Sequence, residues 1–152
     1  MTIKNAPSTD VLAQIPDLGV VVAIQTKTAY GKHFQLNEKC EKPATAQNQW
    51  YVFVKLHEEG TRPSFYVVPR NVVAGAMYAE HREWLSRPAR DGTPHRENPM
   101  RNMLVACLTG YQDRWDLLEN PADQTPLLID PWYTECVERF GLPAGHPGWP
   151  TA

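Results

Sequence analysis

The sequence lacks any hydrophobic run long enough to cross a membrane. Its longest apolar stretch, Leu18 to Ile24, has seven residues, whereas a membrane-spanning helix needs about 20. Residues 1–7 contain no hydrophobic stretch of the signal-peptide kind, so export is not expected. We therefore expect a cytoplasmic protein, and one domain spanning 1–152, because 152 residues is close to an average domain length.

Cysteine is scarce and the common catalytic motifs are missing. The three cysteines, Cys40, Cys107 and Cys136, form no CxxC pair. An odd, widely spaced set indicates reduced thiols and argues against a disulfide framework or a cysteine zinc site. The five histidines show no metal-ligand spacing, and no GxGxxG, P-loop, GxSxG or HExxH motif occurs. Any catalytic site must therefore rest on a less specific constellation.

Net charge is also small, at −2, but it is unevenly distributed. Residues 60–102 carry seven arginines against four acidic residues, whereas residues 103–152 carry two arginines against seven acidic residues. One interpretation is that the middle segment faces phosphate. The other is that its arginines are simply solvated in a loop, and the sequence does not choose between the two. The candidate phosphate contacts are Arg62, Arg70, Arg87 and Arg90.

Five segments have the composition of β-strands. They are rich in β-branched or aromatic residues and are bounded by Gly, Pro or polar residues. The segments are 10–13, 20–28, 33–36, 50–56 and 63–69. The second is apolar on both faces at its start and polar at its end, as in a central strand that emerges from the core.

The hydrophobic period changes after residue 70. An apolar stripe at helical spacing follows, and Asn71 is a reasonable N-cap for it. Near the end of the chain, Asp130-Pro131 is typical of a helix start. Five strands followed by late helices predict a single α/β or α+β domain. The expected later elements are a helix at 71–85, a loop at 86–102, partly helical structure at 103–118 and a helix at about 130–140.

The first two strand segments predict a hairpin around a turn at 16–19. Residues equidistant from the centre of that turn pair with each other, which places Asp10 opposite Gln25. Side-chain alternation puts Gln25 and Lys27 on one face. A carboxylate, an amide oxygen and an ammonium then converge where the strand leaves the core. Such a set suits metal-assisted phosphodiester hydrolysis, because the oxygens hold Mg²⁺ and the ammonium orients water or stabilises charge.

The spacing of Asp10, Gln25 and Lys27 also resembles the motif of a known protein family. Asp10, fourteen intervening residues and Gln25-Thr26-Lys27 resemble the PD-(D/E)XK pattern of the restriction-endonuclease-like superfamily, in its QxK form. The stretch from about 5 to 86 is similar to bacterial members of that superfamily. The resemblance implies an α/β fold with a mixed five-stranded sheet and flanking helices, and it leaves a helical C-terminal extension at about 103–141.

The same resemblance implies an activity and roles for the residues. It implies a Mg²⁺- or Mn²⁺-dependent endonuclease that acts on DNA. Asp10 is then the metal ligand and Gln25 an auxiliary ligand through its side-chain oxygen. Lys27 positions the attacking water or stabilises charge, with Thr28 and His33 as supporting candidates.

A second hypothesis is a non-catalytic binding or interaction module that kept the fold. The superfamily more often has Asp or Glu where this chain has the neutral Gln25. It also usually has a helix before the motif strand, and only nine residues precede Asp10 here. In this case the Trp- and Pro-rich tail, with Trp132 and Trp149, is a candidate surface for a protein partner.

The central strand at 20–28 needs cover on both faces, since it is apolar on both. The helix at 71–85 is expected to cover one of them. A few hundred Å² of contiguous apolar surface is uncommon on a monomer. We therefore expect the second face to be covered either by the late helices or by a second copy in a homodimer.

Overall fold

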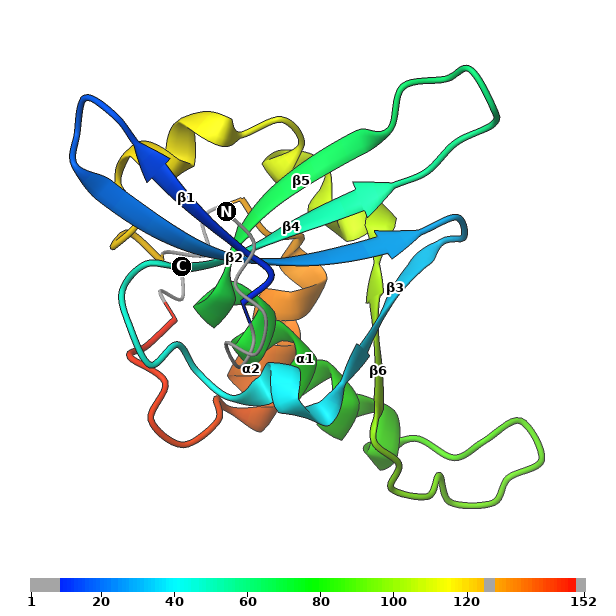
Figure 1. Cartoon of the computed structure of the whole chain (residues 1–152). Helices are drawn as coiled ribbons and strands as arrows, with labels where there is room; N and C mark the ends of the chain where they lie inside the picture. Colours follow the sequence, from blue (N-terminus) through cyan, green and yellow to red (C-terminus); the bar gives the residue numbers. More distant parts are fainter. Residues whose placement is uncertain (1–8, 125–127, 150–152) are drawn as a thin grey trace.

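The computed structural model describes residues 9–124 and 128–149 and is built around a four-stranded mixed sheet (Figure 1). The strand order is β1-β2-β4-β5, with β2 parallel to β4 and the other neighbours antiparallel. The chain is therefore α/β with a mixed sheet, as predicted. The strands are β1 (Val11–Ile15), β2 (Val20–Ala29), β4 (Gln49–Lys55) and β5 (Ser64–Pro69).

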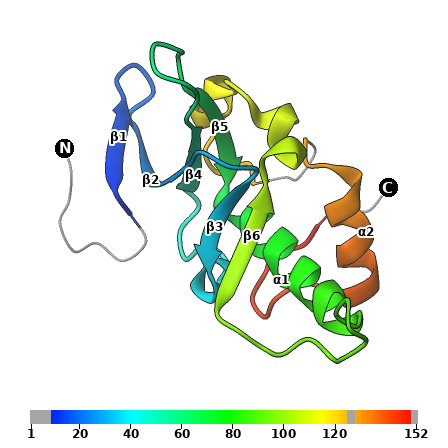
Figure 2. The same cartoon turned by 90° about the vertical axis from the view of Figure 1, so that its right-hand side faces the viewer.

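The prediction of five strands in one sheet was wrong. The third segment, β3 (His33–Asn37), pairs only with β6 (Met100–Leu104), and the two form a separate antiparallel sheet. β1 pairs with residues 20–24 of β2, and β4 pairs with residues 23–29 on the other edge. After β2 the chain turns away from the main sheet and β3 lies beside β6, a strand in a segment that was expected to be a loop (Figure 2).

The strand β6 also corrects the expectation of a loop up to residue 102, whereas the partly helical structure expected at 103–118 is present as 3-10 helix from Val105. The side chains of β6 alternate in burial, with Arg101 and Met103 buried and Met100 and Asn102 exposed. An arginine at an inward position concealed this alternation in the sequence. Between β6 and the last helix of the chain, the structure describes two short 3-10 segments, η2 (Val105–Tyr111) and η3 (Trp115–Glu119).

Two α-helices complete the described elements, α1 (Arg70–Ser86) and α2 (Pro131–Phe140). Both predicted helices are confirmed to within one or two residues. Asp130 caps α2 by accepting from the backbone N–H of Trp132. Asn71 is not the cap of α1, because Pro69 holds that position; instead, Asn71 Oδ1 accepts from the backbone N–H of Ala44 at 2.8 Å.

The two faces of the main sheet are covered by different parts of the same chain. Helix α1 packs on one face, where Tyr51, Phe53 and Val68 join the larger core cluster, and α2 packs on α1 (Figure 2). On the other face, apolar side chains of β2 and β4 pack with Leu117 and Leu118 of η3. A late segment of the chain thus covers the second face of the sheet, which is one of the two predicted alternatives.

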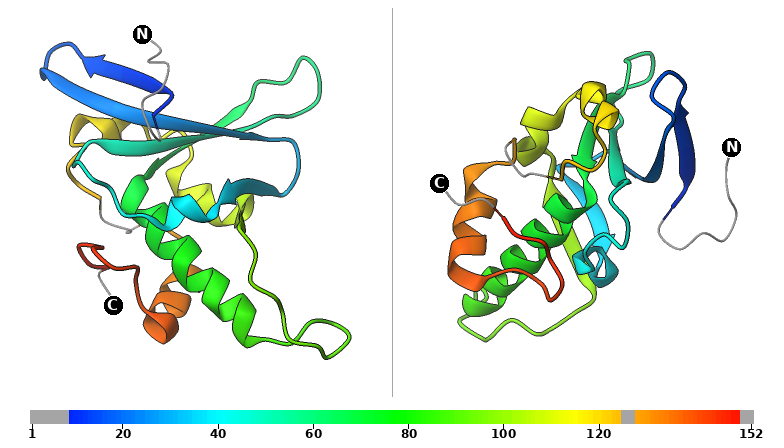
Figure 3. Two further views of the ribbon diagram at one scale, coloured as in Figure 1. Left: turned by 60° about the horizontal axis from the view of Figure 1, so that its bottom comes forward. Right: turned by 90° about the vertical axis from the view of Figure 1, so that its left-hand side faces the viewer.

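The C-terminal tail lies against α1 (Figure 3). Trp149 is 8% exposed, and a Cβ atom on Gly75 of α1 would lie 2.7 Å from its ring. Trp149 is therefore a core residue and is not available to a protein partner as the second hypothesis expected; Trp132 is 38% exposed. Within residues 9–124 and 128–149, no helix has both the length and the apolar character to cross a membrane.

Candidate functional site

The predicted β1–β2 hairpin is present with the predicted register. Val11 is the partner of Ile24, and the backbone N–H of Asp10 donates to Ile24 O at 2.8 Å. Extending this register by one residue places Asp10 opposite Gln25. The backbone of the predicted corner is therefore as the sequence indicated.

The side chain of Asp10 takes a different partner from the expected ones. Its Oδ2 atom accepts from the backbone N–H of Thr26 at 2.8 Å and from Thr26 Oγ1 at 3.2 Å. Asp10 is exposed and is not among the residues that line the neighbouring pocket. The structure thus brings Gln25 and Lys27 together in that pocket, while the Asp10 carboxylate is fixed to Thr26.

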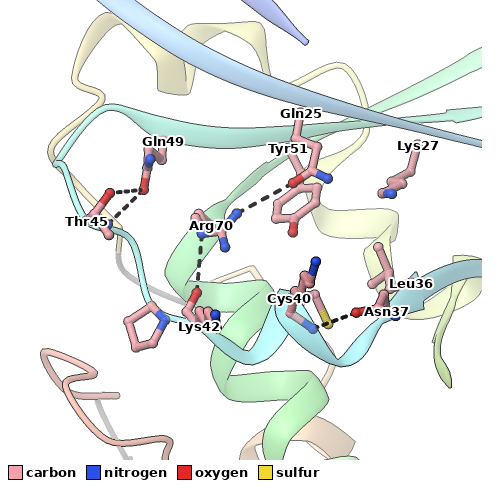
Figure 4. A pocket seen from close by; sticks show the side chains of 12 residues that line it. Gln25, Lys27, Leu36, Asn37, Cys40, Lys42, Thr45, Gln49, Tyr51 and Arg70 are labelled. Atoms are coloured by element: carbon pink, nitrogen blue, oxygen red, sulfur yellow. Dashed lines mark hydrogen bonds between the residues drawn. The ribbon is translucent and has the colours of Figure 1, made fainter. Parts of the chain in front are cut away.

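A pocket of about 630 Å³ lies beside Gln25 and Lys27 (Figure 4). It is bounded by the polar end of β2, by β4, by the start of α1, and by η1 (Glu38–Glu41) with the loop after it. The space stays open because the polar half of β2 carries no large apolar side chain toward η1. The lining residues are Gln25, Lys27, Leu36, Asn37, Lys39, Cys40, Lys42, Pro43, Thr45, Gln49, Tyr51 and Arg70.

The pocket lining is cationic and contains no carboxylate. Four of its twelve residues, Lys27, Lys39, Lys42 and Arg70, are basic, and none is acidic. None of these four forms an ion pair with any residue in the described ranges. The electrostatics of the pocket therefore favour an anionic ligand.

Of the two acidic side chains of η1, Glu38 is exposed and does not line the pocket, and Glu41 is paired with arginines. Glu41 Oε1 accepts from Arg101 Nε at 2.6 Å, and Glu41 Oε2 lies 3.6 Å from Arg82 Nη1. These contacts lie outside the pocket lining. Lys39 and Lys42 of this segment therefore line the pocket, whereas its two glutamates do not.

Arg70 is the most buried cation of the pocket, with 6% of its surface exposed. Its Nε donates to Lys42 O at 3.2 Å and its Nη1 to Gln25 Oε1 at 3.5 Å, and its guanidinium lies 5.9 Å from the Tyr51 ring centroid. All these partners are neutral. Because a buried charge without a counter-ion is costly, a bound anion would stabilise this arrangement.

Two further lining residues carry groups that titrate. Burial, together with the neighbouring carboxylate of Glu41, raises the pKa of the Cys40 thiol to about 12. Burial likewise raises the pKa of Tyr51 to about 12. Both groups are therefore protonated at neutral pH, and Cys40 does not supply a thiolate nucleophile.

The oxygens available to a metal ion are few. No group of three or more His, Cys, Asp and Glu side chains suited to a metal occurs among the residues the structure describes. Mg²⁺ often takes only one or two carboxylates and completes its shell with water and substrate phosphates. Asp10 Oδ2 accepts from Thr26 and Gln25 Oε1 accepts from Arg70 Nη1, so the two predicted ligands have separate partners in this structure.

The other residues predicted from the sequence are distributed over the surface. Of the four arginines suggested as phosphate contacts, only Arg70 lines the pocket. Arg62 lies in a separate open hollow beside the β4–β5 connection, and Arg87 is paired with Glu83 at 2.9 Å. The remaining ones, Arg90, Thr28 and His33, do not line the pocket.

Sequence reasoning missed Lys39, Lys42 and the role of Thr26. The two lysines lie in a segment with as many acidic as basic residues, and this balance gives no sign of a cationic site. Comparison of the chain with protein-family models, with curated proteins and with solved structures found no match. The functional conclusions that follow therefore rest on the site and on the QxK resemblance.

Proposed function

We propose that this chain is a nuclease-like protein that binds the phosphodiester backbone of DNA at the cationic pocket and hydrolyses it with Mg²⁺ or Mn²⁺. One observation carries the proposal. A pocket with four cations and no carboxylate adjoins the strand end that carries Gln25-Thr26-Lys27, beside the cross-strand Asp10. The resemblance to the restriction-endonuclease-like superfamily supports the same conclusion.

The basic residues bind and orient the phosphate. Lys27 and Arg70 donate to its oxygens. Arg70 has N–H groups available for this, because its bonds to Lys42 O and Gln25 Oε1 use only Nε and Nη1 and a guanidinium has five donors. Lys39 and Lys42 add positive charge that draws the backbone to the pocket.

Asp10 and Gln25 are the residues that would hold the metal ion. When bound, such an ion polarises the phosphate and lowers the pKa of an attacking water. Thr26 fixes the Asp10 carboxylate at the end of the hairpin through two hydrogen bonds. Lys27, which lies on the same strand face as Gln25, is placed to orient water or to stabilise the developing negative charge.

The test is cleavage of closed circular and linear DNA by the full chain with Mg²⁺ or Mn²⁺. We expect cleavage of at least one form, and a loss of at least about 100-fold in Lys27→Ala and in Asp10→Asn. Lys32→Ala is the matched control, because Lys32 is exposed and outside the pocket. Cleavage that survives Lys27→Ala, or no cleavage of either form, would refute the proposal.

One observation favours a second function, a DNA-binding module without hydrolysis. The site offers one carboxylate, already bonded to Thr26, and the neutral amide of Gln25. The two functions differ in their response to metal. If the chain is a nuclease, Mn²⁺ tightens DNA binding in the parent and not in Asp10→Asn; if it is a binding module, Mn²⁺ has no effect on either.

A further inference from the structure

The shape of the pocket distinguishes between kinds of phosphate. Its lining comes from β2, β3, η1 and the following loop, β4 and the start of α1, so it is walled by separate segments (Figure 4). Its volume of about 630 Å³ lies in the range of pockets that enclose small ligands. The backbone of a continuous duplex lies across the mouth of such a pocket and leaves its interior unfilled. A group that projects from a strand, such as a terminal nucleotide, does.

The charge of the pocket points to the same kind of ligand. An internal phosphodiester carries one negative charge, whereas a phosphate monoester carries about −1.5 to −2 at neutral pH. Four basic residues and no acidic residue line the pocket. This excess of positive charge suits a monoester better than a diester.

The position of Arg70 adds a third argument. It is 94% buried against Tyr51, so only a group that enters the pocket reaches its guanidinium. Arg101 is equally buried, but it has the carboxylate of Glu41 at 2.6 Å, whereas Arg70 has only neutral oxygens. A phosphate bound in the forked geometry typical of arginine would supply the missing counter-ion.

Uncharged polar groups are available for the rest of a nucleotide. Gln49 Oε1 accepts from the backbone N–H of Thr45 at 2.8 Å, which orients the Gln49 amide at the pocket wall. Its Nε2 atom has no hydrogen-bond acceptor within the described chain. This group can donate to an oxygen of a sugar or base.

We propose that the pocket binds the phosphorylated end of a nucleic-acid strand, with the terminal phosphate monoester held by Arg70 and Lys27. The inference rests on the proposed function, since it assigns a substrate class to the same site. A strand end can carry its phosphate on the 5′ or the 3′ oxygen, and the pocket chemistry is shared by both.

The experiment compares three short single-stranded DNAs that carry a 5′-phosphate, a 3′-phosphate or no terminal phosphate. Each phosphorylated DNA carries its dye at the end opposite the phosphate, and the unphosphorylated DNA is prepared with the dye at each end in turn. Binding to the full chain is measured by fluorescence anisotropy in EDTA, so that no cleavage occurs. We expect one phosphorylated DNA to bind at least about tenfold more tightly than the unphosphorylated one. Inorganic phosphate should compete for this preference.

The variants locate the preference. Arg70→Gln should abolish it, and Arg96→Gln should keep it, because Arg96 is exposed and outside the pocket. If Arg70→Gln fails to fold by circular dichroism, Lys27→Gln tests the same contact from the partly exposed end of the pocket. Equal binding of all three DNAs to the parent would overturn the inference, as would a preference that survives the pocket variants.

The failure of this inference is distinguishable from that of the proposed function. Lys27-dependent cleavage of DNA without a preference for phosphorylated ends would overturn the inference and leave hydrolysis in place. A preference for phosphorylated ends without cleavage would support the inference and refute hydrolysis.

Discussion

The two most buried arginines of the chain should respond in opposite ways to loss of their charge. Arg70 and Arg101 are 6% and 4% exposed. Arg101 bonds to Glu41 at 2.6 Å and donates from Nη1 to Asn98 O at 2.7 Å and to Met100 O at 2.9 Å. Arg70 bonds only to neutral oxygens, at 3.2 and 3.5 Å. Arg101 is therefore a structural charge that a carboxylate neutralises, whereas the charge of Arg70 has no such partner.

The magnitudes follow from this difference. Removing one partner of a buried ion pair costs about 3–5 kcal/mol, so Arg101→Met should lower the free energy of unfolding by about 3 kcal/mol or more. In Arg70→Met, the lost hydrogen bonds cost about 2 kcal/mol. This loss is offset by relief from burying an unpaired charge, which costs several kcal/mol. We expect Arg70→Met to stay within about 1 kcal/mol of the parent, or to be more stable.

The assay is urea unfolding followed by circular dichroism in phosphate-free buffer, with a second series in phosphate. Phosphate should stabilise the parent, by about 2.7 kcal/mol at 100 times its dissociation constant, and should not stabilise Arg70→Met. A loss of about 3 kcal/mol or more in Arg70→Met without phosphate would refute the reasoning, because Arg70 would then be a paired structural charge.

Three further predictions concern the fold. Ala normally stabilises a helix interior relative to Gly. Gly75→Ala should nevertheless lower the free energy of unfolding by about 1–3 kcal/mol, because its Cβ would lie 2.7 Å from Trp149. A gain in stability on urea unfolding would contradict this packing. Burial lowers the pKa of His146, and Gly148 N–H donates to its Nδ1 atom, so the folded chain binds a proton less readily than the unfolded chain. Stability should therefore fall as the pH drops below about 6.5. The urea midpoint should change less between pH 7.5 and pH 5.5 in His146→Gln than in the parent. An equal change in both proteins would contradict this. Sedimentation at micromolar concentration should show a 17.2 kDa monomer, since η3 already covers the second sheet face, whereas a dimer would show that this cover is incomplete.

The main sheet was largely predictable because its strands depend on local patterns. The apolar start and polar end of β2 marked it as central, and the turn before it set the register that pairs Val11 with Ile24. The pairing of β3 was not predictable in this way. It depends on β6, whose inward Arg101 looks polar in sequence and becomes a core residue only through Glu41, 60 residues away.

The same long-range pair explains why the pocket was missed. In sequence, the segment around η1 has balanced charges and predicts a solvated loop. In the fold, Glu41 bonds to Arg101, and Lys39 and Lys42 line a pocket that has no carboxylate in its lining. In this chain a tertiary ion pair therefore leaves the basic residues of a charge-balanced segment at a pocket.

The orientation of Asp10 shows the limit of register arguments at the end of a strand. Opposite residues of an antiparallel pair share a face only while both belong to the ladder. Strand β1 begins at Val11, so Asp10 lies just outside it, and its carboxylate bonds to the Thr26 N–H at the end of the pairing. Hydrogen bonds to a charged group contribute about 1.5–3 kcal/mol each. A metal ion that draws Asp10 from Thr26 to Gln25 must bind with a free energy larger than that of these hydrogen bonds. A metal ion that binds together with a phosphate meets this requirement more readily than a metal ion held by one carboxylate alone.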